Sequence, residues 1–73
     1  MSNRIRELRA THGNMSQLDL AQQIRVTRQT VNAIELGKYS PSLEVAFRIA
    51  ELFGLPLEEV FKYEKKRGVE LGG

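Results

Sequence analysis

The chain has 73 residues, of which 41% are hydrophobic and 27% charged, and these values fit one small soluble globular domain. It contains no cysteine and one histidine, which excludes disulfides and thiolate metal sites, so we expect no metal and no cofactor. The net charge is +2, and the excess lies in the front half. Residues 1–39 hold six Lys or Arg and three acidic residues, whereas residues 40–73 hold five Lys or Arg and six acidic residues. The basic excess in the front half weakly indicates nucleic-acid binding.

No apolar stretch approaches the roughly 18 residues that a membrane span needs. The N-terminus is charged at once, unlike a signal peptide, so we expect a cytoplasmic protein without membrane contact. No nucleophile–base pair, glycine-rich phosphate loop or metal cluster is recognisable, and we therefore expect no catalytic residue and no enzyme.

The first predicted helix covers residues 3–11. Ile5 and Leu8 share one face of this helix, while the charged side chains between them point outward. Gly13 and Asn14 then interrupt the helical pattern, because both residue types tolerate left-handed backbone.

The second helix is predicted over residues 16–24. Ser16 and Asp19 stand at its start with the spacing of a capping box, in which each side chain accepts from the other residue's backbone N–H. Arg25 and Val26 follow this helix as a turn. Its apolar stripe consists of Leu20, Ala21 and Ile24.

The third helix is predicted to begin after its capping residue Thr27 and to end before Gly37. Val31 and Ile34 lie three residues apart on its inward face. The outward positions near its start are polar.

Two more helices complete the pattern. The fourth ends before Gly54; Ser42 is its expected cap, and the alternative is Ser40 with Pro41 at the first helical position. A short fifth helix follows Pro56. No segment has the two-residue alternation of a half-buried strand, so the sequence predicts a compact all-α fold of five helices without strands.

The second and third helices, with the short turn between them, form a helix-turn-helix candidate. Ala21 is small enough to let the third helix cross the second closely. Val26, Val31 and Ile34 hold the pair in the core, which leaves the first turns of the third helix free to project from the domain.

Four residues on that projecting face suit the reading of DNA bases. Arg28 can donate two hydrogen bonds to guanine, and Gln29 and Asn32 can each pair with N6 and N7 of adenine. Ala33 is short enough to contact a thymine methyl group. The alternative is an ordinary solvated helix face, which composition alone would favour. The cap, the turn and the Gly-Lys-Tyr that follows the helix favour DNA contact instead.

Six further residues are candidates for contact with DNA phosphates. One stands at the start of the second helix, where free amides and the helix dipole favour an anion, and the others flank the third helix. The set is Gln17, Thr27, Thr30, Lys38, Tyr39 and Ser40. For Tyr39 an alternative stays open, in which it covers the loop before the fourth helix.

Three runs of residues carry a family resemblance: SQLDLA at 16–21, VTRQTVNAIE at 26–35 and GKYSPSL at 37–43. Together they resemble the phage repressor and Cro-type helix-turn-helix family, also called the XRE family, over roughly residues 3–62. The resemblance implies a five-helix, lambda-repressor-like domain that binds operator DNA, usually as a two-fold dimer.

The resemblance also implies roles for single residues. Gln17 would bind a phosphate and pack near Gln29, and Arg9 would pair with Glu35. Three features depart from the family pattern. Arg25 stands where the family usually has glycine, which costs roughly 1 kcal/mol if the turn needs left-handed backbone. In addition, a leucine at position 36 replaces a common asparagine, and the first interhelical loop is one residue longer than usual.

The sequence therefore predicts a sequence-specific DNA-binding transcriptional regulator, a repressor that reads a palindromic operator in double-stranded DNA as a homodimer. The alternative is an antitoxin-like module that binds a protein partner, with secondary autoregulatory DNA binding. The domain is expected over residues 1–64, and residues 65–73 as a flexible tail. Six apolar residues belong either to the core or to a self-complementary dimer patch: Phe47, Leu52, Leu55, Leu57, Val60 and Phe61.

Overall fold

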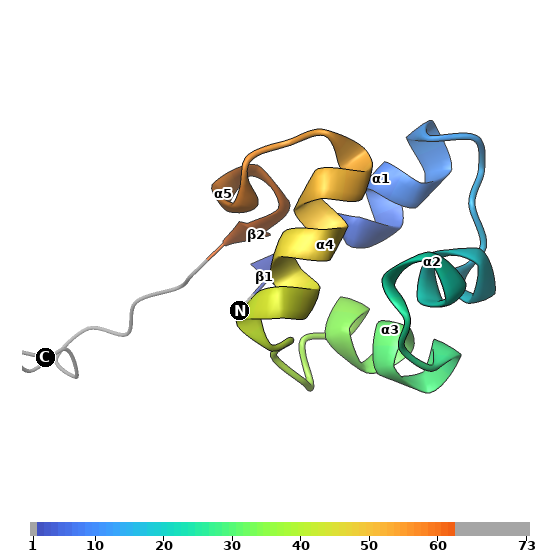
Figure 1. Cartoon of the computed structure of the whole chain (residues 1–73), viewed down its shortest axis with the longest axis horizontal. Coiled ribbons are helices and arrows are strands. Elements are labelled where there is room, and N and C mark those ends of the chain that lie inside the picture. Colours follow the sequence, from blue (N-terminus) through green and yellow to red (C-terminus); the bar gives the residue numbers. More distant parts are fainter. Residues whose placement is uncertain (1, 63–73) are drawn as a thin grey trace, which may run out of the picture.

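A computed structural model describes residues 2–62, and the predicted tail at 65–73 lies outside the described residues. Within this range the prediction of a compact fold with five helices is confirmed (Figure 1). The elements are β1 (Ser2–Asn3), α1 (Ile5–Thr11), α2 (Gln17–Ile24), α3 (Arg28–Glu35), α4 (Leu43–Phe53), α5 (Leu57–Val60) and β2 (Phe61–Lys62). Figure 1 shows α2 and α3 at one end of the molecule and α5 with β2 at the other, with α4 between them.

The expectation of a fold without strands is wrong. β1 and β2 form a two-residue antiparallel pair in which Ser2 lies opposite Lys62 and Asn3 opposite Phe61. Two residues are too few to show an alternating pattern, and the pairing joins the two ends of the described chain. α1 consequently begins at Ile5 rather than at residue 3, and the Asn3 side chain accepts from the backbone N–H of Ile5 at 3.2 Å.

The predicted helix caps are present. The N–H of Asp19 donates to Ser16 Oγ at 2.9 Å, and the N–H of Ser16 donates to Asp19 Oδ2 at 3.2 Å, which completes the capping box. Ser42 Oγ accepts from the N–H of Val45 at 3.2 Å, so Ser42 rather than Ser40 caps α4. These contacts fix where α2 and α4 begin.

The core is formed by one apolar face from each helix and by the start of β2. Its buried side chains are Ile5, Leu8, Leu20, Ala21, Ile24, Val31, Ile34, Ala46, Ile49, Ala50, Phe53, Val60 and Phe61. Of the six residues set apart as core or dimer patch, Val60 and Phe61 are buried, and the three leucines are partly buried against the core. Phe47 alone of the six is exposed, at 54%.

Arg48 on α4 holds the end of α2, a role that the sequence pattern does not indicate. Its Nη1 donates to the backbone carbonyl of Ile24 at 3.0 Å, and its Nη2 lies 2.6 Å from Glu44 Oε2 on the same helix. The last carbonyls of a helix have no partner within the helix, so this bond satisfies one of them. Arg48 thus joins α4 to the helix-turn-helix.

Arg25 ends α2 in the left-handed conformation, with φ 62° and ψ 46°. A side chain in this region costs about 1–2 kcal/mol, whereas glycine adopts it freely. Glycine also loses more conformational freedom on folding, by about 0.5–1 kcal/mol. We therefore expect Arg25→Gly to raise the free energy of unfolding by about 0.5–1 kcal/mol. Urea denaturation followed by circular dichroism measures this change, and a destabilised variant would contradict it.

Candidate nucleic-acid interface

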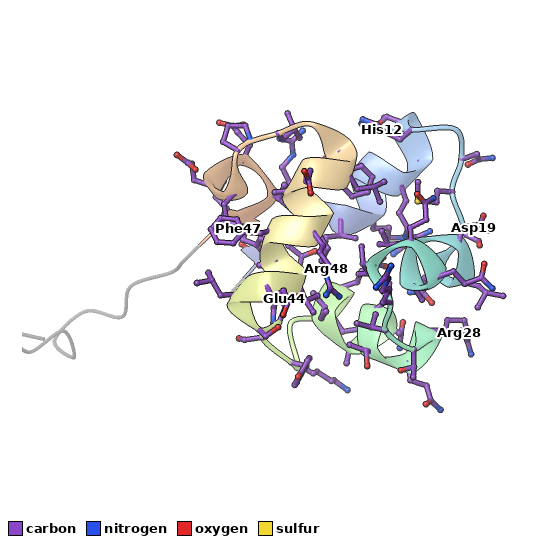
Figure 2. All side chains as sticks on the ribbon, in the orientation of Figure 1. His12, Asp19, Arg28, Glu44, Phe47 and Arg48 are labelled. Carbon is purple, nitrogen blue, oxygen red and sulfur yellow. The ribbon has the colours of Figure 1, made fainter. Side chains whose placement is uncertain are left out.

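The start of α3 presents polar side chains to solvent. Arg28, Gln29 and Asn32 are exposed and Ala33 is half-buried, whereas Val31 and Ile34 on the opposite face are 1% and 2% exposed. Arg28 projects from the end of the molecule that α2 and α3 form (Figure 2), and within residues 2–62 it has no salt-bridge partner. The apolar residues of α3 therefore fix the helix in the fold and leave its polar face accessible.

The hydroxyl groups at the start of α3 are engaged with each other. Thr27 Oγ1 accepts from the backbone N–H of Thr30 at 3.1 Å, and the two hydroxyl oxygens lie 2.9 Å apart. Thr27 is exposed and Thr30 is half-buried. Each hydroxyl retains hydrogen-bonding capacity for a further partner, since a threonine hydroxyl offers one donor and two acceptor sites.

The loop after α3 brings one more predicted contact residue, Tyr39, to the side of α3. Lys38, Tyr39 and Ser40 are exposed. Tyr39 shares an open hollow of about 260 Å³ with residues from the start and middle of α3. The residues that line it are Thr27, Gln29, Thr30, Ala33 and Tyr39. Candidates for base and phosphate contact thus meet at one surface.

Arg9 and Glu35 form the ion pair that the family resemblance implies. Arg9 Nε lies 2.7 Å from Glu35 Oε2, and Arg9 Nη2 lies 3.0 Å from Glu35 Oε1, which is the two-pronged arrangement of a guanidinium on a carboxylate. The side chains are only 15% and 7% exposed. Arg9 Nη1 also donates to the carbonyl of Met15 at 2.9 Å, so the pair joins α1, the loop before α2, and α3.

Gln17, at the start of α2, is half-buried and hydrogen-bonds to two residues of α3. Its Nε2 lies 3.1 Å from Asn32 Oδ1 and 3.1 Å from Glu35 Oε1. The hydrogen bonds of this amide therefore go to Asn32 and Glu35, while Gln29 lies at the separate hollow beside Tyr39.

Two residues beside α3 were missed from the sequence. Asn3 Nδ2 donates to the carbonyl of Ile34 at 2.8 Å, which attaches the last turn of α3 to β1. Arg6 is exposed and lines a second hollow of about 300 Å³ together with Gln17 and Asn32. The only signal for Arg6 in the sequence is its position three residues before Arg9, which places both on one side of α1.

Comparison with known proteins agrees with this geometry. The helix-turn-helix family matches residues 5–60. An uncharacterized HTH-type transcriptional regulator of Methanocaldococcus jannaschii is 52% identical over 64 residues, which are 88% of this chain and 96% of the relative. The HTH-type transcriptional regulator YgzD of Bacillus subtilis is 47% identical over 66 residues, or 90% of this chain and 98% of the relative.

A phage protein is also similar. The transcriptional repressor RstR of the cryptic phage CTXphi in Vibrio cholerae is 36% identical over 59 residues, which cover 81% of this chain and 52% of RstR.

The fold and the exposed second helix of the motif define a helix-turn-helix protein. The chain belongs to the Cro/C1-type, or XRE, helix-turn-helix family. This family binds DNA and is not enzymatic, so the expectation that the chain is no enzyme is confirmed.

Proposed function

We propose that the protein is a transcriptional repressor that binds a specific DNA operator by placing α3 in the major groove. The observation that carries the proposal is the exposed polar face of α3, with Arg28, Gln29 and Asn32 projecting while Val31 and Ile34 are buried. A helix of this kind fits the major groove, where base edges differ in their donors and acceptors. The similarity to a phage repressor supports the direction of regulation.

The proposed contacts divide into two classes. Arg28, Gln29, Asn32 and Ala33 read bases, and Arg28 has guanine as its natural partner. Contacts to phosphate position the helix without reading the sequence. That second set is Gln17, through its backbone N–H at the start of α2, together with Thr27, Thr30, Lys38, Tyr39 and Ser40.

The operator is proposed to be palindromic. The protein is proposed to bind it as a homodimer in the cytoplasm. Two copies of α3 would then lie about 34 Å apart, one turn of DNA. The support is an apolar surface on α4: Leu43 is 66% exposed and Phe47 54%. Leu43 also borders an apolar groove of about 350 Å³ with Pro41, Ala46, Leu57 and Phe61. Figure 2 shows Phe47 and Arg28 on opposite sides of the molecule, so association through Phe47 leaves Arg28 free.

Selection of bound sequences from a random DNA pool, at two salt concentrations, tests the proposal. A repressor of this class enriches one motif with inverted half-sites, and its affinity falls as salt rises because phosphate contacts release counterions. Binding without any enriched motif at either salt concentration would contradict it.

Phe47→Glu tests the dimer. Because a carboxylate on the shared apolar face would be buried against its own copy, we expect the dimer dissociation constant to rise at least about tenfold. Analytical ultracentrifugation measures this, and Leu18→Glu on α2, which also replaces an exposed apolar side chain, is the control. Equal association of both variants and the parent protein would place the interface elsewhere.

The second candidate function is the antitoxin-like module, and the same α4 surface is the observation that favours it. Exposed Leu43 and Phe47 would then contact a different protein, since apolar patches on small domains mark interaction sites. A monomeric protein without an enriched DNA motif would support this reading over the repressor.

A further inference from the structure

A chain of hydrogen bonds runs from the partly buried side of α1 to the exposed face of α3. It begins at Arg9, whose guanidinium donates to both carboxylate oxygens of Glu35 at 2.7 and 3.0 Å. A guanidinium has donors only and stays charged, so Glu35 acts as an acceptor on this side. With side chains 15% and 7% exposed, the pair is a fixed anchor.

The next member is Gln17, and its neighbour determines which way its amide points. Gln17 Nε2 lies 3.1 Å from Glu35 Oε1. An ionised carboxylate accepts and does not donate, so the amide nitrogen, rather than the amide oxygen, must face it. Without a neighbour, either the nitrogen or the oxygen of the Gln17 amide could face α3. The negative charge of Glu35 requires the nitrogen to face it.

The same nitrogen also sets the orientation of Asn32. Gln17 Nε2 lies 3.1 Å from Asn32 Oδ1, so its second N–H donates there. A donor requires an acceptor opposite it, which holds the oxygen of Asn32 toward Gln17. Asn32 is exposed, and its Nδ2 has no hydrogen-bond partner among residues 2–62. Two N–H donors are therefore left for a ligand.

We propose that Asn32 is a donor-only reader, selecting guanine or thymine on the base that it faces, with Gln17 as the residue that positions it. Guanine shows two acceptors, N7 and O6, in the major groove, and thymine shows O4. Two-pronged pairing with adenine requires the asparagine oxygen to face N6 while Nδ2 faces N7, whereas the bond to Gln17 turns that oxygen toward α2 and uses one of its two acceptor sites. The proposal rests on the proposed function, in which α3 reads bases, and it replaces the adenine partner that the sequence predicts for Asn32.

The test measures affinity for all four base pairs at each operator position by fluorescence anisotropy. Asn32→Ala is expected to abolish preference at one position, where the parent protein favours guanine or thymine by about fivefold or more. Asn32→Asp keeps an acceptor for Gln17 but presents an oxygen to the DNA. Its preference at that position is therefore expected to change to cytosine or adenine, whose exocyclic amines donate.

A second variant tests the role of Gln17. Gln17→Ala frees the Asn32 amide to rotate, so adenine is expected to become as acceptable as guanine or thymine at that same position. The readout is the ratio of affinities between base pairs, because a lost phosphate contact would weaken all sequences alike. Gln22→Ala, an exposed glutamine on the same helix, is the matched control and should leave the ratio unchanged.

Coupling between the two residues gives a third readout. The effects of Gln17→Ala and Asn32→Ala on the base preference should be non-additive, whereas those of Gln17→Ala and Gln29→Ala should add. Adenine or cytosine at the position of Asn32, or an unchanged preference in Gln17→Ala, would overturn the proposal while the proposed function stands. Failure of the parent protein to enrich any motif would instead overturn the proposed function, and this proposal with it.

Discussion

Arg28→Ala is expected to weaken binding to the specific operator by about 1–3 kcal/mol and to remove the preference for one base pair. The reason is that Arg28 is exposed at the start of α3, and within residues 2–62 no carboxylate pairs with it. Its two-pronged donor geometry matches O6 and N7 of guanine. Titration of labelled operator and of operators with each base pair exchanged measures both effects.

Lys38→Ala is the matched control, because it also removes one exposed cation. Lys38 lies after α3 and is proposed to bind phosphate, so its loss should weaken binding to all sequences to the same degree. The slope of affinity against salt should fall by about one unit. If both variants lose the same affinity on every sequence, Arg28 acts through its charge alone and does not read bases.

The parts of the fold that depend on neighbouring residues were predictable. The capping box of Ser16 and Asp19 and the cap at Ser42 join residues three apart, so sequence spacing contains the required geometry. Gly54 ends α4 in the left-handed conformation that glycine adopts without strain. For these elements the local sequence and the tertiary structure favour the same backbone.

Contacts between distant residues were not predictable. Asn3 reaches Ile34 across 31 positions, and Arg48 reaches Ile24 across 24. Such bonds depend on how the helices cross. No spacing of asparagine or arginine residues in the sequence indicates a bond of this kind. The strand pair of β1 and β2 is of the same kind, because it forms only once the two ends of the fold meet.

On the proposed binding surface, too, local features were predictable and contacts between helices were not. Helical spacing predicted that Arg28, Gln29 and Asn32 share an exposed face, because outward positions follow from the buried ones. The hydrogen bond from Gln17 to Asn32 did not follow from the sequence. Side-chain pairing between two helices depends on their separation and angle, which the pattern of apolar residues does not contain.

The division of apolar residues between core and surface was also only partly predictable. The sequence contains more apolar residues than a small core needs, and Val60, Phe61 and Phe47 are among them. Whether each is covered depends on packing by other elements: Val60 is 0% exposed, while Phe47 is 54% exposed on the outer side of α4. Phe47 alone therefore remains, with Leu43, as the basis for the proposed dimer surface.

Glu35→Ala is expected to have the largest effect on stability, about 3–5 kcal/mol. Removing this carboxylate leaves the guanidinium of Arg9, only 15% exposed, without its partner, and removes an acceptor of Gln17. A domain of this size has a free energy of unfolding near the lower end of about 5–15 kcal/mol. We therefore expect the Tm, followed by circular dichroism, to fall by more than about 10 °C.

The pair of Glu44 and Arg48 is the matched control, since its N–O distance of 2.6 Å is close to the 2.7 Å of the Arg9–Glu35 pair. Glu44 is 75% exposed, so water solvates both partners and Glu44→Ala should cost no more than about 0.5 kcal/mol. Replacing Arg9 and Glu35 together by leucine should be less damaging than Glu35→Ala, because no unpaired charge remains in the fold. Equal losses in the free energy of unfolding from Glu35→Ala and Glu44→Ala would show that burial of the Arg9–Glu35 pair does not govern how much it stabilises the fold. The link between α1 and α3 would then be held by packing alone.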